Sequence, residues 1–132
     1  MISLASLLSI LVTILQAFPL CKKVSVIQTK EFSTDQYLLK IRADLTGEFK
    51  LQVRIYYNQG HVDYAYQLFT NIPLLRWDNK EEFNHLDTYP HHFHDELGNV
   101  HPSPLIGDTI KDIELVLSEV ANFLEKQTGS RS

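Results

Sequence analysis

The sequence predicts a single α+β domain over residues 1–132, an antiparallel β-meander of about five strands with an N-terminal and a C-terminal helix packed on it. The apolar residues recur at helical spacing at both ends of the chain and at every second position between them. The strand-like segments are joined by short turns, which connect antiparallel neighbours, whereas parallel neighbours need longer crossovers. The 132 residues suffice for one hydrophobic core and are too few for two comfortable domains.

Residues 1–18 are predicted to form an amphipathic helix. One face is apolar and the other carries hydroxyl and amide side chains: Leu4, Leu7, Leu11, Leu15 and Phe18 against Ser6, Ser9, Thr13 and Gln16. No basic residue precedes this run and no small-x-small cleavage pattern follows it, which disfavours a signal peptide. The run is also too short and too rich in hydroxyls for a membrane span. We expect the helix to pack on a sheet, either within the domain or across a homodimer.

Residues 23–78 are predicted to form the antiparallel sheet. The clearest strand covers residues 49–57, where the apolar positions are Phe49, Leu51, Val53, Ile55 and Tyr57. Further strands are expected near residues 24–26, 37–43, 62–68 and 74–77, with turns at 44–47 and 58–60.

Residues 79–106 lack a sustained period and contain several helix- and strand-breaking residues, so they are predicted to form one long loop: Pro90, Gly98, Pro102 and Pro104. Long loops kept in compact domains are commonly functional. Residues 108–126 then return to helical spacing, and Thr109 with Asp112 resembles a capping box at the start of that helix. Residues 128–132 are predicted to be a disordered tail.

The charge is distributed unevenly along the chain. The net charge of −4 argues against a generally basic nucleic-acid-binding protein. Residues 22–57 nevertheless carry seven Lys and Arg against four Asp and Glu, which leaves room for a locally basic surface. A single cysteine, Cys21, cannot form an internal disulfide and favours a reducing compartment.

Histidine is concentrated in the predicted loop. Five of the six histidines fall between residues 85 and 101: His85, His91, His92, His94 and His101. Histidine titrates near neutral pH and ligates metals, so this density indicates proton transfer, metal binding or contact with a polyanion.

Two ordered sequence blocks resemble a known family. Residues 76–79 read Arg-Trp-Asp-Asn, residues 90–94 read Pro-His-His-Phe-His, Tyr64 and Tyr66 precede them, and a helix closes the chain. In this order the blocks resemble the TumE-like toxin family of prokaryotic toxin-antitoxin modules. The chain departs from the pattern at residues 80–85, where one histidine stands in place of a Pro-His-His run. The resemblance implies a small cytoplasmic toxin neutralised by a cognate antitoxin, and supplies no mechanism.

The leading hypothesis is that the protein is an endoribonuclease that works by metal-independent general acid/base catalysis and needs no cofactor. One histidine would take the ribose 2′-hydroxyl proton and a second would protonate the leaving 5′-oxygen. In an extended segment, His92 and His94 project to one face and His91, the remaining catalytic candidate, to the other. Arg76 would stabilise the phosphorane charge and Asp78 would orient an imidazole.

RNA contacts are predicted on the central strands. Four cationic side chains are candidates for phosphate binding: Lys40, Arg42, Lys50 and Arg54. Tyr64 or Tyr66 would stack on a base.

Two alternatives use the same residues differently. His92 and His94 could bind zinc or manganese, with His85 or Asp95 completing the ligand set. The protein could instead be a non-enzymatic toxin or regulator that binds a cellular protein or a metal through the loop. The histidine cluster could also be purely structural, with Trp77 as a core anchor and Arg76 and Asp78 as an ion pair.

Overall fold

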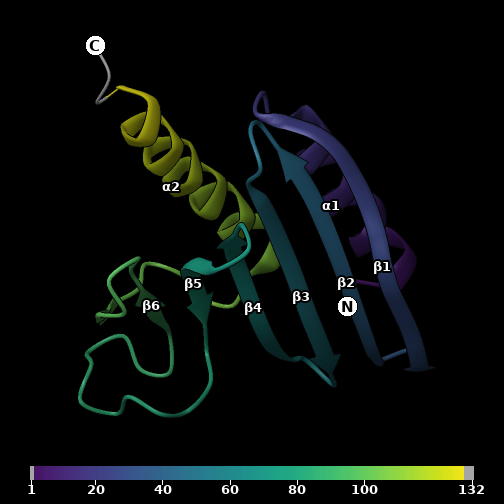
Figure 1. Ribbon diagram of the computed structural model, residues 1–132. Helices are drawn as coiled ribbons and strands as arrows, with labels where there is room; N and C mark the ends of the chain where they lie inside the picture. Colours follow the sequence, from purple (N-terminus) through teal and green to yellow (C-terminus); the bar gives the residue numbers. More distant parts are fainter. Residues whose placement is uncertain (1, 130–132) are drawn as a thin grey trace.

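The computed structural model describes residues 2–129 and contains two helices and seven strands (Figure 1). The elements follow one another as α1 (Leu4–Ala17), β1 (Cys21–Ser33), β2 (Gln36–Leu45), β3 (Lys50–Asn58), β4 (His61–Phe69), β5 (Pro73–Asp78), β6 (His92–His94), β7 (Val100–Pro102) and α2 (Thr109–Gly129). All strands belong to one antiparallel sheet, in chain order. The predicted α+β class, with a helix at each end, is confirmed.

The sheet has seven strands where the sequence predicts about five, because β6 and β7 lie inside the region predicted as loop. Each has only three residues, too few for an alternating pattern to stand out. Strand pairing places them in the sheet: Phe93 lies opposite Trp77 on one side and His101 on the other. The irregular stretch that remains before β6 is therefore residues 79–91.

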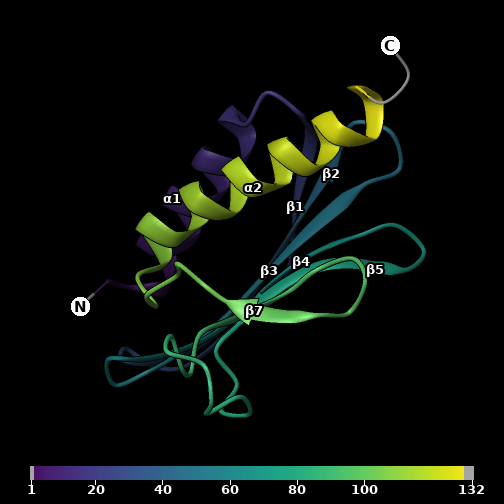
Figure 2. The same cartoon turned by 90° about the vertical axis from the view of Figure 1, so that its left-hand side faces the viewer.

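Both helices pack on the same face of the sheet, side by side (Figure 2). In β2 every second residue is fully buried against them: Tyr37, Leu39, Ile41, Ala43 and Leu45. The helices contribute the matching apolar stripes, Leu7, Leu11 and Leu15 from α1 and Ile113, Val116, Leu117, Val120 and Leu124 from α2. Within residues 2–129, no helix covers the opposite face, and we call it the helix-free face.

The helix ends refine the predicted boundaries. Ser3 caps α1, its hydroxyl oxygen accepting the Ser6 N–H at 3.1 Å. At the start of α2 the cap is Asp108, which accepts the Lys111 N–H at 3.3 Å, and not the expected Thr109. Helix α2 continues to Gly129, so the predicted disordered tail is wrong for residues 128 and 129, and residues 130–132 lie outside the described residues. Among the residues described, neither helix is both long and apolar enough to cross a membrane.

Candidate functional site

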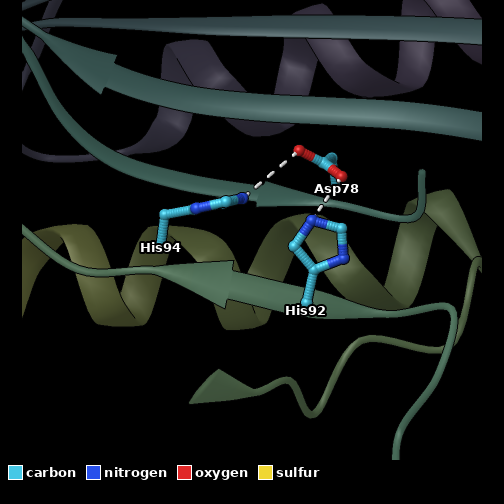
Figure 3. A group of neighbouring side chains, drawn as sticks. All are labelled: Asp78, His92 and His94. Carbon is cyan, nitrogen blue, oxygen red and sulfur yellow. Dashed lines mark ion pairs between the residues drawn. The ribbon is translucent and has the colours of Figure 1, made fainter. Parts of the chain in front are cut away.

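The pairing of β5 with β6 brings four of the predicted catalytic residues together on the helix-free face. Arg76 lies directly opposite His94, and Asp78 directly opposite His92. Because alternate residues of a strand share a face, all four side chains project to the same side. Figure 3 shows the Asp78 carboxylate from β5 pointing at the two imidazoles from β6.

Asp78 is the centre of this cluster. Its Oδ2 accepts a hydrogen bond from Arg76 Nε at 2.7 Å and lies 3.9 Å from His94 Nε2. Its Oδ1 accepts the Lys80 N–H at 3.0 Å and lies 2.8 Å from His92 Nε2. The carboxylate is buried, so its charge is balanced by these neighbours and hardly by water.

His92 is only 1% exposed. Its Nδ1 lies 3.0 Å from the Pro90 carbonyl oxygen, which can only accept, so Nδ1 carries a proton and donates it. The Phe83 ring from the 79–91 segment packs on this side chain edge to face at 4.7 Å and on His94 at 5.8 Å. Sequence reasoning missed Phe83, because a lone aromatic residue in an irregular segment has no period that assigns it to a face.

His94 and Arg76 are the members of the cluster that reach solvent, with 29% and 42% of their side chains exposed. Partial burial lowers the pKa of His94; His92 and Arg76 lower it further, and Asp78 raises it. The neutral imidazole is therefore favoured near neutral pH, which leaves a lone pair for a proton or a metal.

The predicted cationic residues share this face with the cluster. Across the strands, Lys40 lies opposite Arg54, and the same row continues through Ala65 to Asp78 and His92. The neighbouring row runs from Arg42 through Gln52, Gln67 and Arg76 to His94. Lys50, beside the buried Leu51, projects to the helix-free face as well.

A cavity of about 290 Å³ opens in the second row, where Arg42, Gln52 and Gln67 contribute to its lining. Arg42 Nη2 donates to Gln52 Oε1 at 2.8 Å and Arg76 Nη1 donates to Gln67 Oε1 at 3.3 Å, so both guanidinium groups are oriented by glutamines. The two glutamines were not predicted as site residues, although their position in the polar phase of β3 and β4 places them on the face of the cationic residues.

Tyr64 and Tyr66 lie on the opposite face, buried under the helices, so the predicted base-stacking role is not available to them. Burial raises the pKa of Tyr64 and lowers that of His91. The Tyr64 hydroxyl therefore donates to His91 Nδ1, 2.7 Å away. His91 thus projects away from His92 and His94, as predicted, and lies on the helix side of the sheet.

The predicted metal ligands other than His92 and His94 lie elsewhere. His85 is exposed and contacts Phe83 at a ring distance of 6.4 Å. Asp95 sits in the turn between β6 and β7, where it pairs with His101 at 2.7 Å. The ligand set expected from the sequence is therefore corrected: the carboxylate beside the two imidazoles is Asp78, and the ligand atoms of Asp78, His92 and His94 lie within 4.8 Å of one another.

The other two members of the Arg-Trp-Asp-Asn run hold this site in place. Trp77 is buried in the core and packs on Phe93 at 5.1 Å, which fixes β5 against β6 from the helix side. Asn79 Oδ1 accepts the Tyr64 N–H at 3.0 Å, and Asn79 Nδ2 donates to the Val62 carbonyl at 2.7 Å. The run therefore alternates between site residues and residues that anchor the strand.

The Arg-Trp-Asp-Asn and Pro-His-His-Phe-His blocks meet in the paired strands β5 and β6, and these are the blocks by which the sequence resembles a family of toxins. The family model of the toxin TumE matches residues 11–127, which is most of the chain. The protein belongs to the TumE toxin family. No match was found among curated proteins or among solved structures.

Proposed function

We propose that this toxin is an endoribonuclease and that it cleaves RNA at the cluster of Arg76, Asp78, His92 and His94. The observation that carries the proposal is a shared face: a partly exposed histidine and a partly exposed arginine project from the same open sheet surface as four cationic side chains. RNA affinity depends largely on neutralising phosphates with Lys and Arg. The helix-free face offers this charge although the chain is acidic as a whole; four of the sixteen Asp and Glu residues lie in α2 on the other side.

The reaction needs a base, an acid and positive charge at the phosphate. The base removes the 2′-hydroxyl proton, the 2′-oxygen attacks phosphorus, and the bond to the 5′-oxygen breaks as that oxygen takes up a proton. The products are a 2′,3′-cyclic phosphate and a free 5′-hydroxyl. Arg76, exposed and oriented by Asp78 and Gln67, is suited to stabilise the negative charge on the phosphorane oxygens.

The acid/base pair expected from the sequence is reduced to one histidine that a substrate can reach. His92 is too deeply buried to touch RNA and acts as a positioning residue. His94 remains. Its neutral form allows it to take the 2′-hydroxyl proton directly, with water supplying the proton that the leaving 5′-oxygen takes up, or to bind a cation that activates the nucleophile. Both chemistries make His94 essential.

The family membership supports a toxin that acts in the cytoplasm and is neutralised by a cognate antitoxin. A protein or protein segment that covers the helix-free face would block both the cationic rows and the exposed His94. Covering this face would neutralise the toxin without changing its fold.

Inducible expression of the chain alone in a bacterial host tests the proposal. Wild type should arrest growth and fragment cellular RNA, and the purified protein should leave 2′,3′-cyclic phosphate ends. His94→Ala should lower cleavage by about 10²-fold or more, the usual contribution of a general acid/base group. His85→Ala, an exposed histidine of the same region, is the matched control and should cleave like wild type. Growth arrest with intact RNA would refute the ribonuclease proposal and support a toxin that acts by binding.

A further inference from the structure

We propose that Asp78, His92 and His94 form a binding site for one divalent transition-metal cation such as zinc. The inference deepens the proposed function, on which it rests for its biological use; cation binding itself does not depend on that function. The three ligand atoms come from two paired strands and converge on one point of the helix-free face (Figure 3).

The buried Nε2 atom of His92 indicates a bound cation. It has no aligned hydrogen-bond partner in the described part of the chain, although Asp78 Oδ1 is only 2.8 Å away. Because Nδ1 holds the proton donated to Pro90, a neutral His92 directs the Nε2 lone pair into the cluster. A lone pair and a carboxylate oxygen at this distance repel each other unless a cation lies beside both.

That cation is either a proton or a metal ion. A proton on Nε2 would make an ion pair with Asp78 at 2.8 Å, but the imidazole and the carboxylate are not aligned for the hydrogen bond that normally joins such a pair. A metal ion lies to the side of the line between its ligands. With metal–ligand bonds of about 2.1 Å, a tetrahedral site separates neighbouring ligand atoms by about 3.4 Å.

The observed separations bracket that value. They are 2.8 Å from Asp78 Oδ1 to His92 Nε2 and 3.9 Å from Asp78 Oδ2 to His94 Nε2. One ligand atom from each of the three residues lies within 4.8 Å of the other two. Small rotations of the three side chains bring their ligand atoms to the spacing of a tetrahedral site. Two imidazoles and one carboxylate, with a further position open, is the donor set of catalytic zinc sites. His94, on the exposed side, leaves that open position accessible to RNA.

The groups that hydrogen-bond to the three ligands also fit a metal site. Metal-binding histidines usually donate their other ring N–H to a carbonyl or carboxylate, and ligating carboxylates are themselves hydrogen-bonded. His92 meets the first condition through Pro90, and Asp78 meets the second through Lys80 and Arg76. The Phe83 ring packs on both imidazoles and limits access of water to them. Arg76 holds Oδ2 through Nε, so Oδ1 is the carboxylate oxygen that faces His92.

Metal binding would change the role of His94. An imidazole whose lone pair is bound to a cation cannot also be the base, so the two versions of the mechanism exclude each other. A divalent cation would add its charge to that of Arg76 at the phosphate. Cleavage would then depend on the cation, whereas the direct acid/base version proceeds without it.

Metal titration of the purified full-length chain, first stripped with chelator, tests the site. Calorimetry with zinc should give saturable binding near one equivalent, zinc should raise the melting temperature, and cobalt should give visible absorption of low-symmetry coordination. His94→Ala should weaken zinc binding by about 100-fold or more, since loss of an outer-shell partner alone costs 10- to 100-fold. His85→Ala and His101→Ala, two histidines outside the set, should bind like wild type. His94→Gln provides a second variant should the alanine variant fail to fold.

Two results would overturn the site. The first is a wild-type protein that takes up neither zinc nor cobalt saturably. The second is a folded His94 variant that binds zinc as tightly as wild type, which would mean that zinc binds adventitiously at the surface histidines. The failure of this inference differs from that of the proposed function. Chelator-resistant RNA cleavage without metal uptake keeps the ribonuclease and removes the site. Stoichiometric metal binding without RNA cleavage keeps the site and removes the ribonuclease.

Discussion

Replacing Asn79 with alanine should destabilise the protein by about 2 to 3 kcal/mol. Strand β5 ends at Asp78, so the next backbone groups of β4 have no β5 residue to pair with. The Asn79 side chain replaces that missing partner, accepting from the Tyr64 N–H and donating to the Val62 carbonyl. An unsatisfied buried donor costs about 1 to 3 kcal/mol, and a part-buried hydrogen bond contributes roughly 0.5 to 1.5 kcal/mol. The loss is a large share of the 5 to 15 kcal/mol typical of a domain.

Urea unfolding followed by the fluorescence of Trp77, the only tryptophan, measures this loss. Asn84→Ala is the matched control: it removes an exposed asparagine nearby and should change the free energy of unfolding by less than about 0.5 kcal/mol. Asn79→Asp should destabilise the protein at least as much as Asn79→Ala, because it places a buried carboxylate oxygen against the Val62 carbonyl oxygen, to which it cannot donate. Equal stabilities for Asn79→Ala and Asn84→Ala would refute the reasoning that Asn79 completes the sheet.

Three further outcomes follow from the two faces of the sheet. Lys40→Gln with Arg54→Gln should weaken RNA binding and, if each contacts one phosphate, lower the slope of log affinity against log salt by about 1.4, as a salt titration would show. Tyr64→Phe removes the hydrogen bond to His91 and should cost about 1 kcal/mol of stability in urea unfolding, while leaving RNA cleavage unchanged. Burial raises the pKa of Asp112 in the fold, so ionising it disfavours the folded state. Its part of the stability is present below the unfolded-state pKa and is lost as pH rises through the raised pKa; Asp112→Asn should remove that pH dependence.

The controls for these outcomes use the opposite face. Lys111→Gln with Lys126→Gln changes the net charge equally on α2 and should leave the salt slope unchanged. An equal loss of RNA affinity in both double variants would mean that binding follows net charge and not the cationic rows. A Tyr64→Phe variant that lost cleavage while keeping its stability would place the tyrosine in the reaction. Identical pH profiles for wild type and Asp112→Asn would mean that this carboxylate does not titrate between the folded and unfolded states.

The face of the sheet to which each strand residue projects could be predicted from the sequence. In β4 the tyrosines belong to the same phase as Val62 and Leu68, and apolar phases face the core. The burial of Tyr64 and Tyr66 therefore follows from the alternation that predicted the strand, and assigning them to RNA stacking ran against it. Lys40, Arg42 and Arg54 belong to the other phase, which is why the structure finds them together.

Which residues meet in the site could not be predicted from the sequence. Arg76 and Asp78 share a face by spacing alone, but joining them to His92 and His94 requires the pairing of Trp77 with Phe93, 16 positions further along the chain. Strands of three residues carry too little periodicity to fix that register. The sequence therefore offered Asp95 as the carboxylate near the histidines, because it is adjacent in the chain. Spatial adjacency, set by a long-range pairing, selects Asp78 instead.

The geometry of the cluster of Arg76, Asp78, His92 and His94 also indicates whether it serves stability or function. A cluster kept for stability alone would satisfy its buried polar atoms, since an unpaired one in a low-dielectric site is costly. His92 Nε2 is buried and unaligned, and the ion pair that Arg76 makes with Asp78 is open to solvent on the arginine side, where such pairs contribute little. Apolar residues of similar volume would hold β5 to β6 at least as well. The arrangement is therefore better explained by what it leaves accessible at His94 and Arg76 than by the stability it provides.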